Sequence, residues 1–167
     1  KCLKIDKNKG LEKYHKSLEV FLTQKPHYAL DQNGLFLEWK VQLQEQEKKQ
    51  VLEHFSAVFS NCSLVYIEQD QPLLGLYYAN FSSWCNPDFF KAKLRKAKAQ
   101  IDLLHPYEAL DYLEKLKTLD SEKKFEEDIQ KLIKEANQII KRYSSSSIII
   151  ADFFNDKLKW NDQTSYL

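Results

Sequence analysis

The stretch ALDQNGLFLEWKVQLQ, Ala29–Gln44, decides the predicted fold, because its apolar residues from Leu35 to Leu43 recur at every second position. Asn33-Gly34 lies between two such runs, and both residues tolerate the positive φ that a type I′ hairpin turn requires. One face then carries seven apolar side chains: Tyr28, Leu30, Leu35, Leu37, Trp39, Val41 and Leu43. The pattern predicts a β-hairpin with a two-residue turn.

Two further regions are predicted to add strands to this hairpin. Leu64–Glu68 and Pro72–Ala79 are short apolar runs around the turn Gln69–Gln71. Near the end of the chain, the run from Ser147 to Phe154 is expected to form a buried strand, with Leu158–Trp160 pairing back to it. The sequence therefore predicts a mainly antiparallel sheet of about five strands.

The remaining segments have the period of helices. Apolar residues at steps of three and four predict one helix from Leu11 to Leu22, ended by Pro26, and an inserted helix over Glu45–Ser60. Between residues 86 and 143 they predict three more: one after the Asn86-Pro87 cap, one from Pro106, and one from Asp120 or Ser121 to Tyr143. Short connections indicate antiparallel neighbours.

These elements predict one α+β domain over residues 1–167. A helix- and hairpin-rich half (1–80) is followed by a three-helix segment (86–143) packed on the sheet, and a strand or hairpin (147–160) returns to that sheet. A chain of this length is most simply one domain.

Composition excludes several classes of protein. The net charge is +1, which excludes a strong field over the whole molecule, and no apolar run is long enough to span a bilayer. The sequence contains no glycine-rich phosphate-binding motif, no nucleophile motif and no CxxC pair, so no cofactor and no metal are predicted. Cys62 and Cys85 are expected to be buried free thiols, or a disulfide if the protein is exported. The chain begins at Lys1 and contains no methionine, so we expect either a removed leader, with export, or a shortened chain; the compartment stays open.

The polar face of the hairpin suggests one catalytic alternative. In the predicted register Asp31 faces Phe36, and Asp31, Glu38 and Lys40 share one side of the sheet. Two carboxylates can hold a divalent cation, and a lysine can stabilise charge developing on a phosphate.

With these residues, the order helix, strands, helix, strand over Leu11–Ala79 resembles the core of the PD-(D/E)xK nuclease superfamily. The resemblance implies Glu12 or Glu19 as a further carboxylate. The seven-residue step from acid to Glu38 is short for that family, and Pro26 lies five residues before Asp31. The same alternation is typical of any half-buried hairpin with a solvated face.

Two other stretches carry surface signals. Lys91, Arg95 and Lys98 lie at steps of four and three on one helix face, which suits an acidic partner or phosphates and also suits a solvated face. The stretch Tyr77–Phe90 contains six aromatic residues, and its connection carries Phe81, Trp84 and Phe89, which we expect at an interface.

We therefore predict a non-catalytic protein-binding domain that contacts another protein through Phe81, Trp84, Phe89, Lys91, Arg95 and Lys98. An inhibitor or immunity-type partner of a bacterial protein fits the size. The alternatives are a metal-dependent nuclease using Asp31, Glu38 and Lys40, and a nucleic-acid binder without cleavage.

Overall fold

The computed structural model describes residues 7–19, 30–31, 34–35 and 42–164, with backbone alone for 30–31, 34–35 and 146–164. The chain divides into two compact units, Lys1–Leu103 and Leu104–Leu167, and each is described by itself. The single domain predicted above stays a prediction. None of the described helices is both long enough and apolar enough to cross a membrane.

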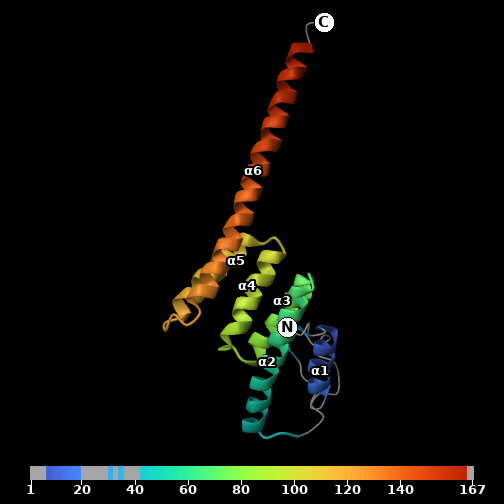
Figure 1. Ribbon diagram of the computed structural model, residues 1–167, viewed down its shortest axis with the longest axis vertical. Helices are drawn as coiled ribbons and strands as arrows, with labels where there is room; N and C mark the ends of the chain where they lie inside the picture. The colour runs from blue at the N-terminus through green and yellow to red at the C-terminus, as the bar shows by residue number, and fades with distance from the viewer. Residues whose placement is uncertain (1–6, 20–29, 32–33, 36–41, 165–167) are drawn as a thin grey trace, which may run out of the picture. The chain divides into compact units, whose positions relative to one another are not determined.

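Helices make up almost all of the described chain (Figure 1). The elements, in chain order, are α1 (Lys7–Glu19), β1 (Leu30–Asp31), β2 (Gly34–Leu35), α2 (Glu45–Glu68), α3 (Pro72–Cys85), α4 (Phe90–Asp102), α5 (Pro106–Leu119) and α6 (Glu126–Thr164). The predicted α+β fold with a five-stranded sheet is therefore wrong, since the described residues contain two strands of two residues each.

The two short strands pair in a different register from the predicted one. Leu30 pairs with Leu35 and Asp31 with Gly34, so that Gln32 and Asn33 lie between the paired residues. The prediction placed the turn at Asn33-Gly34 and Asp31 opposite Phe36, and that register was wrong by two residues.

The second predicted hairpin is an antiparallel helix pair. Leu64–Glu68 is the last part of α2, and Pro72–Ala79 opens α3, with Pro72 in its first turn. A short apolar run cannot be assigned to strand or buried helix from periodicity alone. Proline in a first helical turn costs no hydrogen bond, so it favours the observed start.

The predicted C-terminal strand over residues 147–160 is also wrong, because α6 continues without interruption to Thr164. The serines before the isoleucine run do not break the helix. Ser144 Oγ donates to the carbonyl of Ile140 (3.0 Å), and Ser145 Oγ donates to that of Lys141 (2.9 Å). Bonding to the carbonyl four residues earlier keeps serine compatible with a helix.

In the first unit, α3 packs against both α2 and α4, which also contact each other, and α1 packs on α2. Phe59 of α2 is surrounded by aromatic rings, with centroids 5.5 Å from Phe81, 6.0 Å from Phe55 and 6.2 Å from Tyr78. The core cluster consists of Leu11, Leu18, Phe55, Val58, Phe59, Cys62, Tyr78, Phe81 and Cys85. The buried stripe predicted for the first helix is confirmed at Leu11 and Leu18.

Small residues bring α2 and α3 close together. Ser56 Oγ donates to the Ser82 carbonyl (2.9 Å), and Ser82 Oγ donates to the Ser56 carbonyl (2.6 Å). About two helical turns beyond Ser56 on α2, Ser63 Oγ donates to the carbonyl of Gly75 (2.7 Å). All three hydroxyl groups are buried and hydrogen-bonded, so the polar contacts add no unsatisfied group to the interface.

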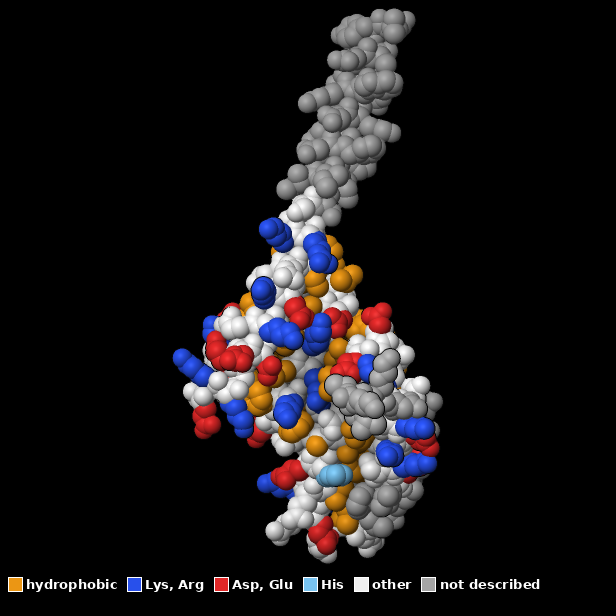
Figure 2. All heavy atoms as spheres, viewed as in Figure 1, with side chains coloured by type: hydrophobic (Ala, Val, Ile, Leu, Met, Phe, Trp, Pro, Cys, Tyr) orange, Lys and Arg blue, Asp and Glu red, His pale blue; other side chains and the backbone are white. Residues whose placement is uncertain are grey.

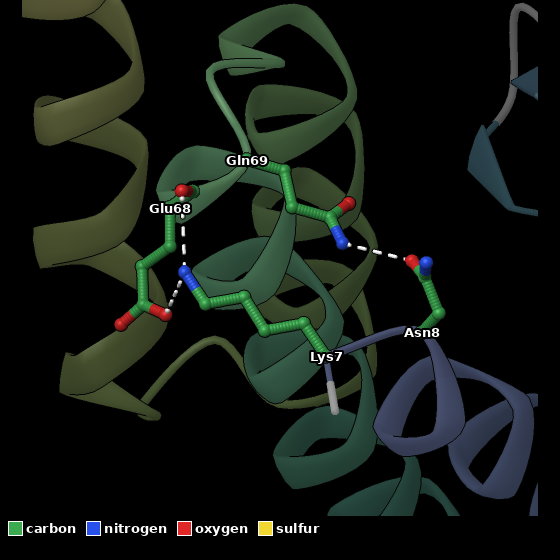
Figure 3. A network of polar contacts seen from close by, with 4 residues as sticks. All are labelled: Lys7, Asn8, Glu68 and Gln69. Carbon is green, nitrogen blue, oxygen red and sulfur yellow. Dashed lines mark hydrogen bonds and ion pairs between the residues drawn. The ribbon is translucent and has the colours of Figure 1, made fainter. Parts of the chain in front are cut away.

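Polar contacts join the start of α1 to the end of α2 (Figure 3). Lys7 Nζ lies 3.1 Å from the carboxylate of Glu68 and donates to its carbonyl at 3.3 Å. Gln69 Nε2 donates to Asn8 Oδ1 at 3.0 Å. The ion pair is exposed and contributes about 1 kcal/mol or less.

In the second unit, α5 and α6 pack as an antiparallel pair. Pro106 begins α5 as predicted, and Asp120, one of the two predicted caps, accepts hydrogen bonds from the amides of Lys124 (3.0 Å) and Phe125 (2.7 Å) just before α6. The three helices predicted between residues 86 and 143 are thus confirmed, with α6 longer than predicted.

Candidate functional site

The connection from α3 to α4 carries the aromatic residues that the sequence singled out. Asn86 Oδ1 accepts a hydrogen bond from the amide of Asp88 (3.0 Å), and the amide of Phe89 donates to the Asn86 carbonyl (3.1 Å). Asn86 therefore stabilises a turn instead of capping a helix at Pro87, and α4 begins only at Phe90. The predicted start of this helix was three residues early.

The three aromatic residues chosen as contacts differ in exposure. Phe81 is 1% exposed, because it shares the buried face of α3 with Tyr78 and Cys85 at steps of three and four. Phe81 is thus a core residue, which corrects its predicted place at the surface. Trp84 is 44% exposed, and Phe89 is half-buried.

Three of the basic residues of α4, Lys91, Arg95 and Lys98, lie along one edge of the helix but have different surroundings. Lys91, in the first turn, is exposed, whereas Lys98 is half-buried and pairs with Asp102 at 2.8 Å. Arg95 lies between them and is half-buried against α2, where its Nη1 donates to the hydroxyl of Ser60. Among the described residues, no aspartate or glutamate forms an ion pair with Arg95.

Burial is the largest influence on the guanidinium of Arg95, and it lowers the pKa of that group from its ordinary value. Tyr14, Cys62 and Glu68 act in the opposite direction and raise it. An arginine stays protonated at neutral pH even so, because a guanidinium is a very weak acid. The site therefore holds a positive charge at reduced hydration.

Positive charge is concentrated in α4. The helix contains five basic residues and one acidic residue, a net charge of +4, whereas the whole chain has a net charge of +1. On the face shown in Figure 2, basic and acidic side chains are interspersed, with hydrophobic side chains exposed between them. The net positive charge of α4 is thus larger than that of the whole chain.

The predicted nuclease residues are only partly described. Asp31 pairs through its backbone with Gly34, and Glu38 and Lys40 lie outside the described residues. Glu12 is exposed on α1 and pairs with Lys16 at 2.7 Å. This lysine lowers the pKa of the Glu12 carboxyl group. Within the described ranges, no three metal-ligating side chains gather in a group that could hold an ion.

Cys62 and Cys85 are both free and buried, which confirms the prediction of buried thiols over a disulfide. Burial raises the pKa of each thiol to about 12. A thiol is nucleophilic only as its thiolate, so neither cysteine is prepared for covalent chemistry at neutral pH.

The sequence-based prediction missed Ser60. This serine is fully buried and is the hydrogen-bond partner of Arg95, although 35 residues separate them. Part of its signal was available: Ser56 and Ser60 lie four residues apart in the predicted helix Glu45–Ser60, and Ser63, three residues on, lies beyond the predicted end of that helix. A polar residue repeated on a buried face needs buried hydrogen-bond partners.

Comparison with known proteins gives no further guide, since the chain matches no family model and no curated protein matches it.

Proposed function

We propose that this chain is a non-catalytic protein-binding domain whose contact surface lies where α3 meets α4. We call it the Trp84 surface and define it by Trp84, Phe89 and Lys91. The observation that carries the proposal is the exposure of Trp84, 44%, at the end of a helix whose neighbouring aromatic residues are buried.

Energetic reasoning supports this surface. Tryptophan offers a large apolar area with few rotatable bonds, so it contributes much to binding for a small loss of entropy, and it is enriched among residues that dominate interfaces. The Asn86 turn fixes the backbone between Trp84 and Phe89, so the surface is organised before a partner arrives. A dedicated inhibitor or immunity-type role, in which one domain blocks one bacterial protein, would use a surface of this kind.

A capture experiment with matched variants tests the proposal. The Trp84→Ala variant should lose proteins that the wild-type chain captures from a lysate. Leu73→Ala is the control, because Leu73 is 68% exposed in the first turn of the same helix, away from the surface. We expect Leu73→Ala to capture the same proteins as the wild type.

Thermal unfolding of the same variants separates binding from folding. Both substitutions should leave the melting temperature within a few degrees of the wild-type value, since surface changes are usually within about 0.5 kcal/mol. If Trp84→Ala captures every wild-type partner, the proposal is wrong. A large fall in its melting temperature would show instead that Trp84 belongs to the core.

A further inference from the structure

Arg95 is a half-buried charged residue of the first unit that the Trp84 surface does not include. A guanidinium has five N–H donors. Among the described residues, Arg95 donates one hydrogen bond, to Ser60 on α2. A half-buried positive charge with a single hydrogen-bond partner in the described part of the chain is costly unless an anion approaches it. The described carboxylate whose charge acts on Arg95 is that of Glu68, and it is already paired with Lys7 (Figure 3).

Lys91 extends the positive charge toward the Trp84 surface. It lies four residues before Arg95, which places their Cβ atoms about 6 Å apart on the same side of α4. Lys98, on the other side of Arg95, is neutralised by Asp102. The positive charge that remains for a ligand is therefore at the Lys91 end of the helix, two residues after Phe89.

These surroundings fit a protein carboxylate better than a nucleic-acid backbone. Repeated phosphates require a track of exposed basic residues, whereas Arg95 is half-buried beside Ser60 and Asp102 closes the row. Arginine in a recess binds a planar carboxylate through two parallel hydrogen bonds, and Ser60 orients it for this contact. Exposed Trp84 nearby in the chain suits an apolar side chain of the same ligand.

We propose that Lys91, Arg95 and Ser60 form a carboxylate-binding site, and that its ligand is an acidic segment of a partner protein with an apolar residue next to the acid. This inference rests on the proposed function and adds the chemical class of the partner. Arg95 pairs with the carboxylate, Lys91 contributes longer-range attraction, and Ser60 is a positioning residue.

The chain contains only two arginines, Arg95 and Arg142, so NMR of their side-chain Nε–H groups gives two signals and an internal control. The probe is a capped ten-residue peptide of alternating Glu and Leu pairs, added to the full chain in about 0.15 M salt, where screening removes distant attraction. A peptide with Gln in place of Glu is the matched control. We expect the Glu peptide to shift the Arg95 signal to saturation and leave Arg142 unchanged.

Two surface variants test which lysine of α4 contributes to binding the peptide. Lys91→Ala should weaken the affinity for the Glu peptide about fivefold, the effect of one exposed ion pair. Lys93→Ala removes the same charge from a different side of α4, where its Nζ lies over the ring of Phe90, and should leave the affinity unchanged. Melting temperatures of both variants should equal that of the wild type.

Three results would overturn the inference: an Arg95 signal that does not respond, equal shifts of both arginines, or a Gln peptide that binds as well as the Glu peptide. A twelve-nucleotide single strand that shifts Arg95 at a lower concentration than the peptide would replace it with nucleic-acid binding. If only the carboxylate inference fails, the Arg95 signal does not respond while Trp84→Ala still loses captured proteins. If the proposed function fails, Trp84→Ala captures the same proteins as the wild type, so the two failures are distinguishable.

Discussion

The close approach of α2 and α3 can be tested at Gly75. A Cβ atom added at this residue would lie 2.5 Å from Cγ1 and 3.3 Å from Cδ1 of Ile67, and 3.4 Å from the Ser63 carbonyl oxygen. Ile67 cannot easily turn away, because a β-branched side chain in a helix is largely confined to one χ1 rotamer. The helices would have to move apart, which would stretch the hydrogen bond from Ser63 to Gly75.

Three contributions set the expected cost of Gly75→Ala. Overpacking a close interface costs about 1–3 kcal/mol, and weakening a buried hydrogen bond costs about 1 kcal/mol. The higher helix propensity of alanine offsets about 1 kcal/mol of this cost. We therefore expect the free energy of unfolding to fall by about 1–3 kcal/mol.

Gly10→Ala supplies the matched control. Gly10 also lies inside a helix, α1, and an added Cβ would have no atom within 4 Å, so the same substitution should raise stability by up to about 1 kcal/mol. Urea unfolding followed by circular dichroism measures both changes. A third variant, Ile67→Ala, removes the clashing atoms, and Gly75→Ala in that background should lose most of its cost. If Gly75→Ala stabilises the wild type as much as Gly10→Ala does, the two helices do not approach this closely.

Three further predictions follow from burial and from the polar face of the hairpin. Phe81→Ala should lower the free energy of unfolding by about 3–5 kcal/mol in urea, as for any large buried side chain; a loss below 1 kcal/mol would mean that Phe81 is exposed. Because burial raises the pKa of Cys62 and Cys85 to about 12, the unfolded thiols ionise first, and stability should fall above pH 9 by about 1.4 kcal/mol per pH unit for each thiol. Urea unfolding at pH 8 and pH 10 measures this, with Cys→Ser variants expected to remove the difference. Under the nuclease alternative, DNA or RNA should be cut with Mg²⁺ or Mn²⁺, and Asp31→Ala with Glu38→Ala should abolish it; cleavage by the double variant would exclude these residues.

Local signals predicted the helices whose ends carry a distinctive residue. Pro106 marks a helix start by chemistry that acts within one turn, and the structure confirms it. Asp120 was predicted to cap the last helix, but it holds the turn before α6, which begins six residues later at Glu126. The spacing of apolar residues also predicted which side of α1 is buried, since Leu11 and Leu18 share that side. Such signals succeed because the interactions that decide them lie a few residues apart.

The predicted sheet failed where the deciding interactions are distant. Leu64–Glu68 contains Val65, Tyr66 and Ile67, residue types that favour strands, whereas Pro72–Ala79 is apolar and has only its two tyrosines in favour of a strand. Packing between the two segments overrides that preference. Ser63 reaches the backbone of Gly75, which requires two helices in close contact, and no local pattern reports a contact of this kind.

The same serines connect the error in the fold to the residue missed at the site. Ser56 and Ser63 bond to α3, while Ser60, between them on α2, bonds to Arg95 of α4. One row of small hydroxyl residues therefore fixes α2 against both neighbours and holds the guanidinium in place. A side chain larger than serine at position 60 would push Arg95 outward and turn a recessed carboxylate site into an ordinary solvated lysine–arginine edge. The recess, and with it the chemical preference that we infer, depends on the volume of one buried residue that no functional motif identifies.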